Sequence, residues 1–147
     1  MKEQTRQSVT DGHFVWPVRV YYEDTDSGGV VYYANYLRFM ERARTEWLRS
    51  LGFEQDALAR EAGVIFAVRS AALEYLRPAR FNDLLQVDSR IAGVGRASLT
   101  FEQSIVRREE PAVPLCTGRI RVACVSADAL RPRPIPPEIL AEISGDR

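Results

Sequence analysis

The sequence predicts an α+β fold in which an antiparallel β-sheet wraps around one long central helix. One segment keeps helical spacing over several turns, the segments after it alternate with period two, and mostly short turns connect them. Short connections between successive strands are typical of antiparallel pairing. With 147 residues, of which 46% are hydrophobic, the chain can bury one core. We assign 1–12 to a flexible polar leader and 13–147 to a single domain.

The first two elements follow from the spacing of their apolar residues. Period-two alternation predicts a strand that brings Tyr22 to the core side. A helix is predicted from Asn35, a residue type that favours the N-cap, to Leu51, and Gly52 is expected to end it. The apolar arc of this helix is broad, which indicates that much of its surface is covered. The arc comprises Tyr36, Leu37, Phe39, Met40, Ala43, Trp47, Leu48 and Leu51.

The rest of the chain predicts a short helix, four strands and a terminal helix. Exposed edge strands of such a sheet often pair with a second copy, so we expect a homo-oligomer. The short helix is expected at 54–62, the strands at 64–75, 85–91, 97–105 and around 116–124, and the terminal helix after 132–137.

Charge and composition exclude several classes of protein. Lysine and arginine total 20, aspartate and glutamate total 20, and the formal net charge is zero, which argues against nucleic-acid binding. No apolar run approaches the roughly 20 residues of a membrane helix. The start of the sequence lacks the pattern of a secretory signal. We therefore expect a cytoplasmic protein without membrane insertion.

The cysteines and the only histidine do not suggest a metal site. Cys116 and Cys124 share one predicted strand, where they would lie roughly 27 Å apart, too far for a disulfide. We interpret them as small buried packing residues. His13 is placed at the leader, far from the other candidates, and there is no CxxC pair. The sequence therefore predicts neither a disulfide nor a bound metal.

The strongest candidate for chemistry is Asp26, which stands before Gly28 and Gly29 at the entrance of the long helix. Free backbone N–H groups and the positive end of the helix dipole stabilise negative charge at such an entrance. Glycine permits close approach of a substrate carbonyl, and a neighbouring carboxylate can attack that carbonyl or activate water. The alternative is that Asp26 only caps a turn, since Asp-Ser-Gly-Gly is ordinary turn chemistry.

The same residues resemble a known family. The stretch from Tyr22 to Tyr36, YEDTDSGGVVYYANY, is followed by ERARTE at 41–46 and by EYLRPARFND at 74–83. These segments resemble the hotdog-fold acyl-CoA thioesterases of the 4-hydroxybenzoyl-CoA thioesterase class, and most of all the YbgC type, the Tol-Pal-associated acyl-CoA thioesterases of Gram-negative bacteria. The resemblance extends from Val15 to about Pro134.

The resemblance implies an activity, an assembly and roles for individual residues. It implies hydrolysis of an acyl-CoA thioester to free acid and CoA, without a metal or separate organic cofactor. Asp26 would be the nucleophile or the general base, and the backbone N–H of Tyr33 would polarise the thioester carbonyl. Family members form homodimers that share active sites between subunits, and homotetramers built from those dimers. The resemblance does not decide whether the acyl group is carried by CoA or by acyl carrier protein. It also leaves the length of the acyl chain, and its aromatic or aliphatic character, undetermined.

One position departs from the pattern. Proteins of the YbgC type usually have histidine where this chain has Tyr33, and His13 does not replace it. The related 4-hydroxybenzoyl-CoA thioesterases resemble this chain in having tyrosine there. The substitution keeps the backbone N–H and removes a side chain that could transfer a proton.

Three further residues are candidates, each with a structural alternative. Tyr22 would hold Asp26 or the acyl group, or would simply pack in the core. Glu41 is interpreted as the partner of Arg44 or Arg38 in an ion pair on the helix rather than as a second reacting carboxylate. Arg96 follows a GVG turn where the resembling thioesterases bind the CoA nucleotide, so it is a candidate phosphate contact or a solvated arginine.

The alternative function is a non-catalytic module. Such a module would bind acyl-CoA or acyl carrier protein, or act as a scaffold in a Tol-Pal-type envelope system. Asp26 beside two glycines favours chemistry, whereas the missing histidine favours the module. Release of thiol from acyl-CoA distinguishes the two.

Overall fold

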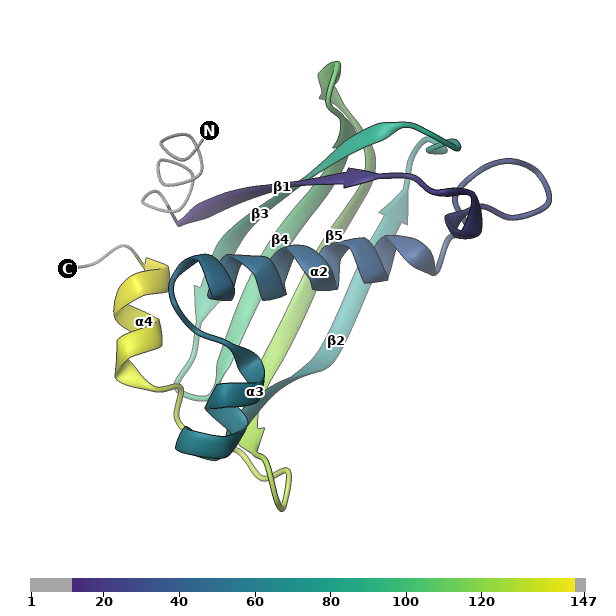
Figure 1. Cartoon of the computed structure of the whole chain (residues 1–147). Coiled ribbons are helices and arrows are strands. Elements are labelled where there is room, and N and C mark those ends of the chain that lie inside the picture. The colour runs from purple at the N-terminus through teal and green to yellow at the C-terminus, as the bar shows by residue number, and fades with distance from the viewer. Residues whose placement is uncertain (1–11, 145–147) are drawn as a thin grey trace.

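The computed structural model describes residues 12–144, and within this range five strands form one antiparallel sheet in the order β1-β3-β4-β5-β2 (Figure 1). The predicted fold class, an antiparallel sheet with one long helix, is confirmed. The strands are β1 (His13–Arg19), β2 (Val64–Tyr75), β3 (Leu84–Val94), β4 (Ser98–Arg107) and β5 (Glu110–Ser126). The helices are α2 (Asn35–Ser50), α3 (Gln55–Ala57), which continues as a π-helical turn (Leu58–Ala62), and α4 (Pro137–Ser144), and a 3₁₀ turn spans Tyr22–Asp24.

The long helix α2 crosses the sheet from one edge to the other. The chain leaves β1 at one edge and enters β2 at the opposite edge, so the connection has to pass over the face of the sheet (Figure 1). Gly52, with φ of 95°, lies just beyond the end of α2 as predicted. The helix is therefore the element around which the sheet is arranged.

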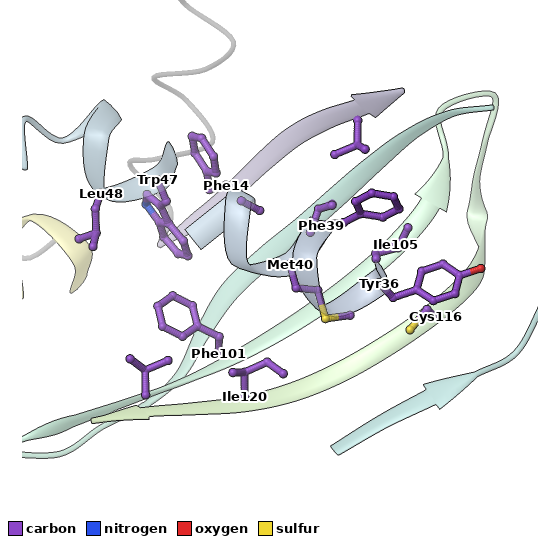
Figure 2. Packing of buried hydrophobic residues seen from close by; sticks show 14 of the residues in the cluster. Phe14, Tyr36, Phe39, Met40, Trp47, Leu48, Phe101, Ile105, Cys116 and Ile120 are labelled. Carbon is purple, nitrogen blue, oxygen red and sulfur yellow. The ribbon is translucent and has the colours of Figure 1, made fainter. Parts of the chain in front are cut away.

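The buried stripe of α2 fills the centre of the core (Figure 2). Phe39, Met40 and Ala43 have no exposed surface. Nearer the end of the helix, the Trp47 ring lies 5.8 Å from that of Phe14 in β1 and 5.9 Å from that of Phe101 in β4. Aromatic side chains bury large areas, so these contacts hold the helix to strands from different parts of the chain.

Leu37 is the exception among the predicted core positions of the helix. It is 39% exposed, whereas its neighbour Tyr36 is buried. Successive helical residues are rotated by about 100°, which turns Leu37 away from the sheet. The apolar arc that the sequence predicts for this helix is therefore too wide, because it includes Leu37.

A buried glutamine ties α2 to the sheet. Gln103 in β4 is only 2% exposed, and its amide nitrogen donates to the Met40 carbonyl at 3.0 Å and to the Ser89 hydroxyl at 2.9 Å. Its amide oxygen accepts a hydrogen bond from Nη1 of Arg44 at 2.9 Å. One side chain therefore links two positions of the helix with two neighbouring strands.

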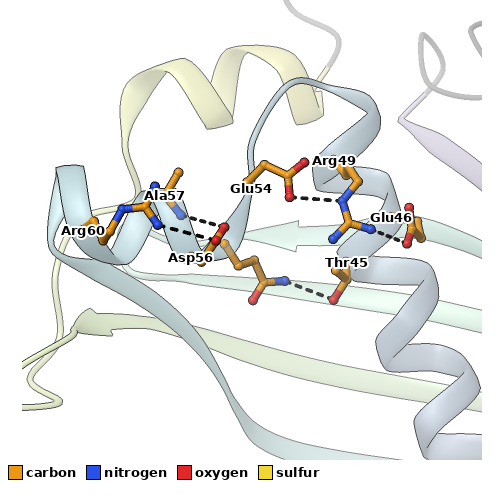
Figure 3. A network of polar contacts seen from close by, with 8 residues as sticks. Thr45, Glu46, Arg49, Glu54, Asp56, Ala57 and Arg60 are labelled. Carbon is orange, nitrogen blue, oxygen red and sulfur yellow. Dashed lines mark hydrogen bonds and ion pairs between the residues drawn. The ribbon is translucent and has the colours of Figure 1, made fainter.

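Polar contacts link the end of α2 to α3 on the surface (Figure 3). Arg49 pairs with Glu46 and Glu54, and the Gln55 amide donates to the Thr45 hydroxyl at 3.1 Å. Exposed ion pairs contribute little to stability. These contacts mainly fix where α3 lies beside the helix.

Two details near the start of the chain differ from the predictions, and a third prediction is not tested. The N-cap is Ala34, and Asn35 is the first residue of α2, where its side chain donates to the Asp24 carbonyl at 2.9 Å. His13 begins β1 and pairs with Asp88 on β3, so it is part of the sheet and not of the leader. Apart from Gly12, the predicted leader lies outside the described residues.

Cys116 and Cys124 are both free and buried in β5, as predicted. Burial raises the pKa of the Cys116 thiol to about 12, so this group is not a nucleophile at neutral pH. Both cysteines are packing residues.

Replacement of Gln103 is expected to destabilise the fold. Gln103→Ala removes three hydrogen bonds and leaves the Arg44 guanidinium without its acceptor, so the free energy of unfolding should fall by about 2–4 kcal/mol. Urea unfolding followed by circular dichroism measures the change. The control Gln86→Ala, on the outer face of β3, should stay within about 0.5 kcal/mol. Equal stability of both variants would show that the network does not hold the helix.

Candidate active site

Asp26 lies in a tight turn between the 3₁₀ segment and α2. Its backbone N–H donates to the Val30 carbonyl at 2.9 Å, and one carboxylate oxygen accepts from the Gly28 N–H at 2.8 Å. Gly29 has φ of 81°, a conformation that favours glycine. The turn is closed by a bridge between Thr25 and Val31.

The carboxylate of Asp26 is nevertheless available. The residue is exposed, and within residues 12–144 its second carboxylate oxygen, Oδ2, makes no hydrogen bond. The turn-capping interaction expected as the alternative to chemistry is therefore present, but it uses only one of the two oxygens.

The backbone of Tyr33 provides a donor at the start of α2. The amide of Tyr32 is bonded to the Asp24 carbonyl at 3.0 Å, and that of Asn35 to the Tyr32 carbonyl at 2.8 Å. Between them, the N–H of Tyr33 has no acceptor in the described part of the chain. Since it lies at the positive end of the helix dipole, this N–H can bind a developing oxyanion.

A loop at 76–83, here called the support loop, holds the Asp26 turn in place. The Val31 N–H donates to the Ala79 carbonyl at 2.8 Å, and the Ala79 N–H donates to the buried hydroxyl of Tyr36 at 3.0 Å. Arg107 in β4 fixes the loop itself, with Nε on Asp83 at 3.0 Å and Nη2 on the Pro78 carbonyl at 2.8 Å. The turn and the helix start thus share one rigid support.

Tyr22 does not reach the core, contrary to the prediction. It is 79% exposed and lies edge-on to the exposed ring of Phe81, with 5.7 Å between the ring centroids. The strand alternation ends early because the Tyr21 N–H donates to the Asp24 carboxylate at 2.8 Å, which folds the chain into the 3₁₀ turn. The side chain of Tyr33 is also exposed, and the centre of its ring lies 5.9 Å from that of Tyr75 in β2.

Arg96 lies at the other end of the sheet from Asp26. The Asp26 turn adjoins the support loop, which precedes β3, whereas Arg96 follows β3, a strand that spans roughly 34 Å. The carbonyl of Arg96 accepts from the Ile135 N–H at 3.0 Å, which brings the segment with Arg133 beside it. A single copy therefore does not unite Arg96 with Asp26.

A cavity of about 260 Å³ lies between α2 and strands β2, β4 and β5. Arg44 lines it, and its guanidinium is hydrogen-bonded to Gln103. The predicted ion pair of Glu41 with Arg44 or Arg38 does not occur in the described part of the chain. Burial lowers the pKa of Arg44 to about 10, and the nearby charge of Glu41 partly opposes this shift. The guanidinium therefore stays protonated at neutral pH.

Neither a metal cluster nor a membrane helix occurs between residues 12 and 144. No three His, Cys, Asp or Glu side chains in this range are arranged to hold a metal ion, and no helix in it is long and apolar enough to cross a bilayer. The expected absence of a cofactor and the cytoplasmic location stay predictions.

Comparison with known proteins identifies the family. The thioesterase-like superfamily matches residues 20–143. The chain belongs to this superfamily. It is 48% identical over 129 residues to the acyl-CoA thioester hydrolase YbgC of Escherichia coli O6:H1, covering 88% of this chain and 94% of that protein. It is 44% identical over 133 residues to the acyl-CoA thioesterase YbgC of Haemophilus influenzae, covering 90% and 96%. The predicted membership in the YbgC type is thus confirmed.

The solved structures confirm the hotdog fold of this thioesterase-like chain. A 4-hydroxybenzoyl-CoA thioesterase mutant complexed with 4-hydroxybenzoyl-CoA matches with a TM-score of 0.81, covering 90% of this chain and 99% of that one. Because the two sequences are only 20% identical, the likeness concerns the fold alone.

Loss of Arg107 is expected to loosen the site of this thioesterase-like domain without unfolding it. Arg107→Met removes two hydrogen bonds to the support loop, so the amide of Val31, which depends on Ala79, should exchange its hydrogen roughly tenfold to a hundredfold faster. Hydrogen exchange followed by NMR measures this. The control Arg108→Met replaces an exposed neighbour and should leave Val31 unchanged. Unaltered protection in Arg107→Met would contradict the role of the loop.

Proposed function

We propose that this protein hydrolyses acyl-CoA thioesters to a free carboxylic acid and CoA. The observation that carries the proposal is the free oxygen of Asp26 in the turn before α2, together with the unoccupied N–H of Tyr33 at the helix start. Two relatives that are 44% and 48% identical to this chain over the aligned residues are named acyl-CoA thioesterase and acyl-CoA thioester hydrolase. Family and site chemistry thus support the same reaction.

The Tyr33 N–H is assigned to the thioester carbonyl. As the carbonyl carbon becomes tetrahedral, its oxygen gains negative charge, and a fixed N–H at the positive end of a helix stabilises this charge more than it stabilises the ground state. One such donor contributes roughly a hundredfold to a thousandfold in rate. This step uses the backbone only, so tyrosine in place of histidine leaves it intact.

Asp26 is assigned to the carbon of the same carbonyl, by one of two routes. As a nucleophile, its free oxygen forms an acyl anhydride and expels CoA as the thiolate, after which water cleaves the anhydride. As a general base, it removes a proton from water that attacks the thioester directly. Both routes need the oxygen that the Gly28 N–H does not occupy.

The active unit is proposed to be a homodimer formed through the edge strand β2. All residues from Ala67 to Ala72 are exposed, and a long bare edge can pair with a second copy. In an antiparallel pair about a two-fold axis, the Tyr75 end of one β2 meets the Val64 end of the other. Tyr75 adjoins Tyr33, and the Val64 end lies at the same end of the sheet as Arg96.

This pairing explains how distant residues of one chain can act together. The Arg96 end of one copy comes to the Asp26 end of its partner, which makes Arg96 a candidate contact for the phosphates of CoA. Assembly of dimers into a homotetramer, use of acyl carrier protein in place of CoA, and a link to a Tol-Pal-type system are further parts of the proposal that rest on the family resemblance.

Asp26→Asn is expected to abolish most of the activity. The substitution keeps the shape and removes the charge, so kcat/KM for thiol release from acyl-CoA should fall by about two to four orders of magnitude. A panel of short, medium, long and aromatic acyl-CoAs should be assayed. The control Asp128→Asn changes an exposed residue of a distant turn and should retain full activity.

Two results would contradict the mechanism. Full activity in Asp26→Asn would remove Asp26 from the reaction. Tight binding of acyl-CoA by the wild type without release of thiol would show a non-catalytic module.

Ser70→Lys is expected to separate the proposed dimer. Ser70 is exposed near the middle of β2, where a two-fold axis would set it against its own counterpart and two like charges would repel. Light scattering after size exclusion should show a wild-type dimer or tetramer and a smaller Ser70→Lys species with reduced activity. Gln86→Lys on the outer face of β3 is the control. A monomeric wild type with full activity would refute the assembly.

A further inference from the structure

The cavity beside α2 has one apolar wall and one polar wall. Leu48, Phe66, Leu99, Phe101 and Val122 supply the apolar surface. The polar wall belongs to α2 and α3, where Arg44 and Glu41 face the space together with Thr45 and Gln55. An apolar pocket with a few convergent polar groups is typical of a site for a small organic ligand.

Arg44 is the cation that lines this cavity, and no ion pair with it forms within residues 12–144. Its Nη1 donates to Gln103 and its guanidinium carbon lies 5.9 Å from the centre of the Phe101 ring, whereas Nε and Nη2 have no acceptor within residues 12–144. Gln103 is neutral, and its amide nitrogen is already bonded to Met40 and Ser89. Glu41 is exposed to solvent and forms no ion pair with Arg44 in the described structure.

A half-buried guanidinium with free donors matches one chemical group best. Its planar donors bind a carboxylate through two parallel hydrogen bonds, and such charge-assisted bonds are stronger than neutral ones. A purely apolar ligand would cover the guanidinium and leave its donors unpaired, which is unfavourable.

We propose that this cavity binds the far end of a short acyl group that ends in a carboxylate, and that Arg44 pairs with that carboxylate. The inference rests on the proposed function and on the dimer through β2. It makes short ω-carboxyacyl thioesters the preferred substrates, and it makes Arg44 the residue that sets this preference.

The position of the cavity agrees with this use. Phe66, Ala67 and Val68 of β2 line it, near the Val64 end of that strand. In the proposed dimer, the Tyr75 end of the other β2, which adjoins the Tyr33 N–H, meets this region. An acyl group whose carbonyl is bound at one copy can therefore extend into the cavity of the other.

The size of the cavity limits the chain length. Pockets for drug-sized ligands usually measure about 300–1,000 Å³. A volume of about 260 Å³ falls below this range and suits a short acyl chain rather than a long one.

The test compares acyl-CoA pairs that differ only at the far end. Adipoyl-CoA is compared with hexanoyl-CoA, and suberoyl-CoA with octanoyl-CoA, in thiol-release assays of the wild type, Arg44→Met, Arg44→Lys and Glu41→Gln. Arg42→Met replaces an exposed arginine of the same helix as the matched control. Thermal unfolding of every variant shows whether it is folded at the assay temperature.

We expect the wild type to prefer the carboxylate-bearing member of each pair. Arg44→Met should lower the ratio of kcat/KM values, carboxylate-bearing over apolar, roughly tenfold to a hundredfold, the range for loss of a charge-assisted hydrogen bond. Arg44→Lys should restore part of the ratio, Arg42→Met should not change it, and Glu41→Gln should raise it, because a negative charge near the carboxylate is removed. If Arg44 had only a structural role, Arg44→Met would lower kcat/KM for the carboxylate-bearing and the apolar acyl-CoA alike, and their ratio would not change.

The outcomes separate the inference from the proposed function. An unchanged ratio in folded Arg44→Met, or a wild type that prefers hexanoyl-CoA, would overturn the inference while the hydrolase activity stands. Absence of hydrolysis with every acyl-CoA would overturn the proposed function instead. In that case calorimetric titration of the wild type and Arg44→Met with adipoyl-CoA and hexanoyl-CoA decides the inference, and equal affinities for both ligands would overturn it.

Discussion

The crossing of α2 over the sheet is the constraint on which the rest of the structure depends. Because β1 and β2 occupy opposite edges, the connection between them, which contains α2 and α3, passes over the face of the sheet, and the buried stripe of α2 becomes the core. The crossing also fixes the helix start against the support loop through the hydroxyl of Tyr36 and the backbone of Ala79. The donor at Tyr33 is therefore positioned by the same packing that stabilises the fold.

Burial of the helix has a polar component with consequences for function. Gln103 bonds a helix carbonyl and accepts from Arg44, which draws a cation toward the apolar interior. Burial disfavours that charge, as its lowered pKa of about 10 indicates. A neutral glutamine orients the guanidinium without cancelling its charge, whereas an acidic partner would have satisfied it. The same bond thus anchors the helix and leaves the cation free to bind a ligand.

Local patterns in the sequence predicted the elements better than the contacts between them. Alternation and helical spacing located the strands and α2, because side-chain periodicity is a local property. They failed at Tyr22, where one hydrogen bond to Asp24 ends the alternation. They also missed the partner of Arg44, because Gln103 lies on a distant strand and helical spacing suggested only neighbours on the same helix. The Asp26 turn was recognised because all its residues are close in sequence.

The two interpretations of Asp26 are compatible. A carboxylate has two oxygens, and the turn uses one of them to accept the Gly28 N–H. That bond fixes the side chain, so the second oxygen is held in a defined direction at no further loss of rotamer freedom during reaction. The N–H of Tyr33, which the proposed mechanism assigns to the thioester carbonyl, has no acceptor in the described part of the chain. In the proposed mechanism, the capping interaction orients the oxygen that reacts.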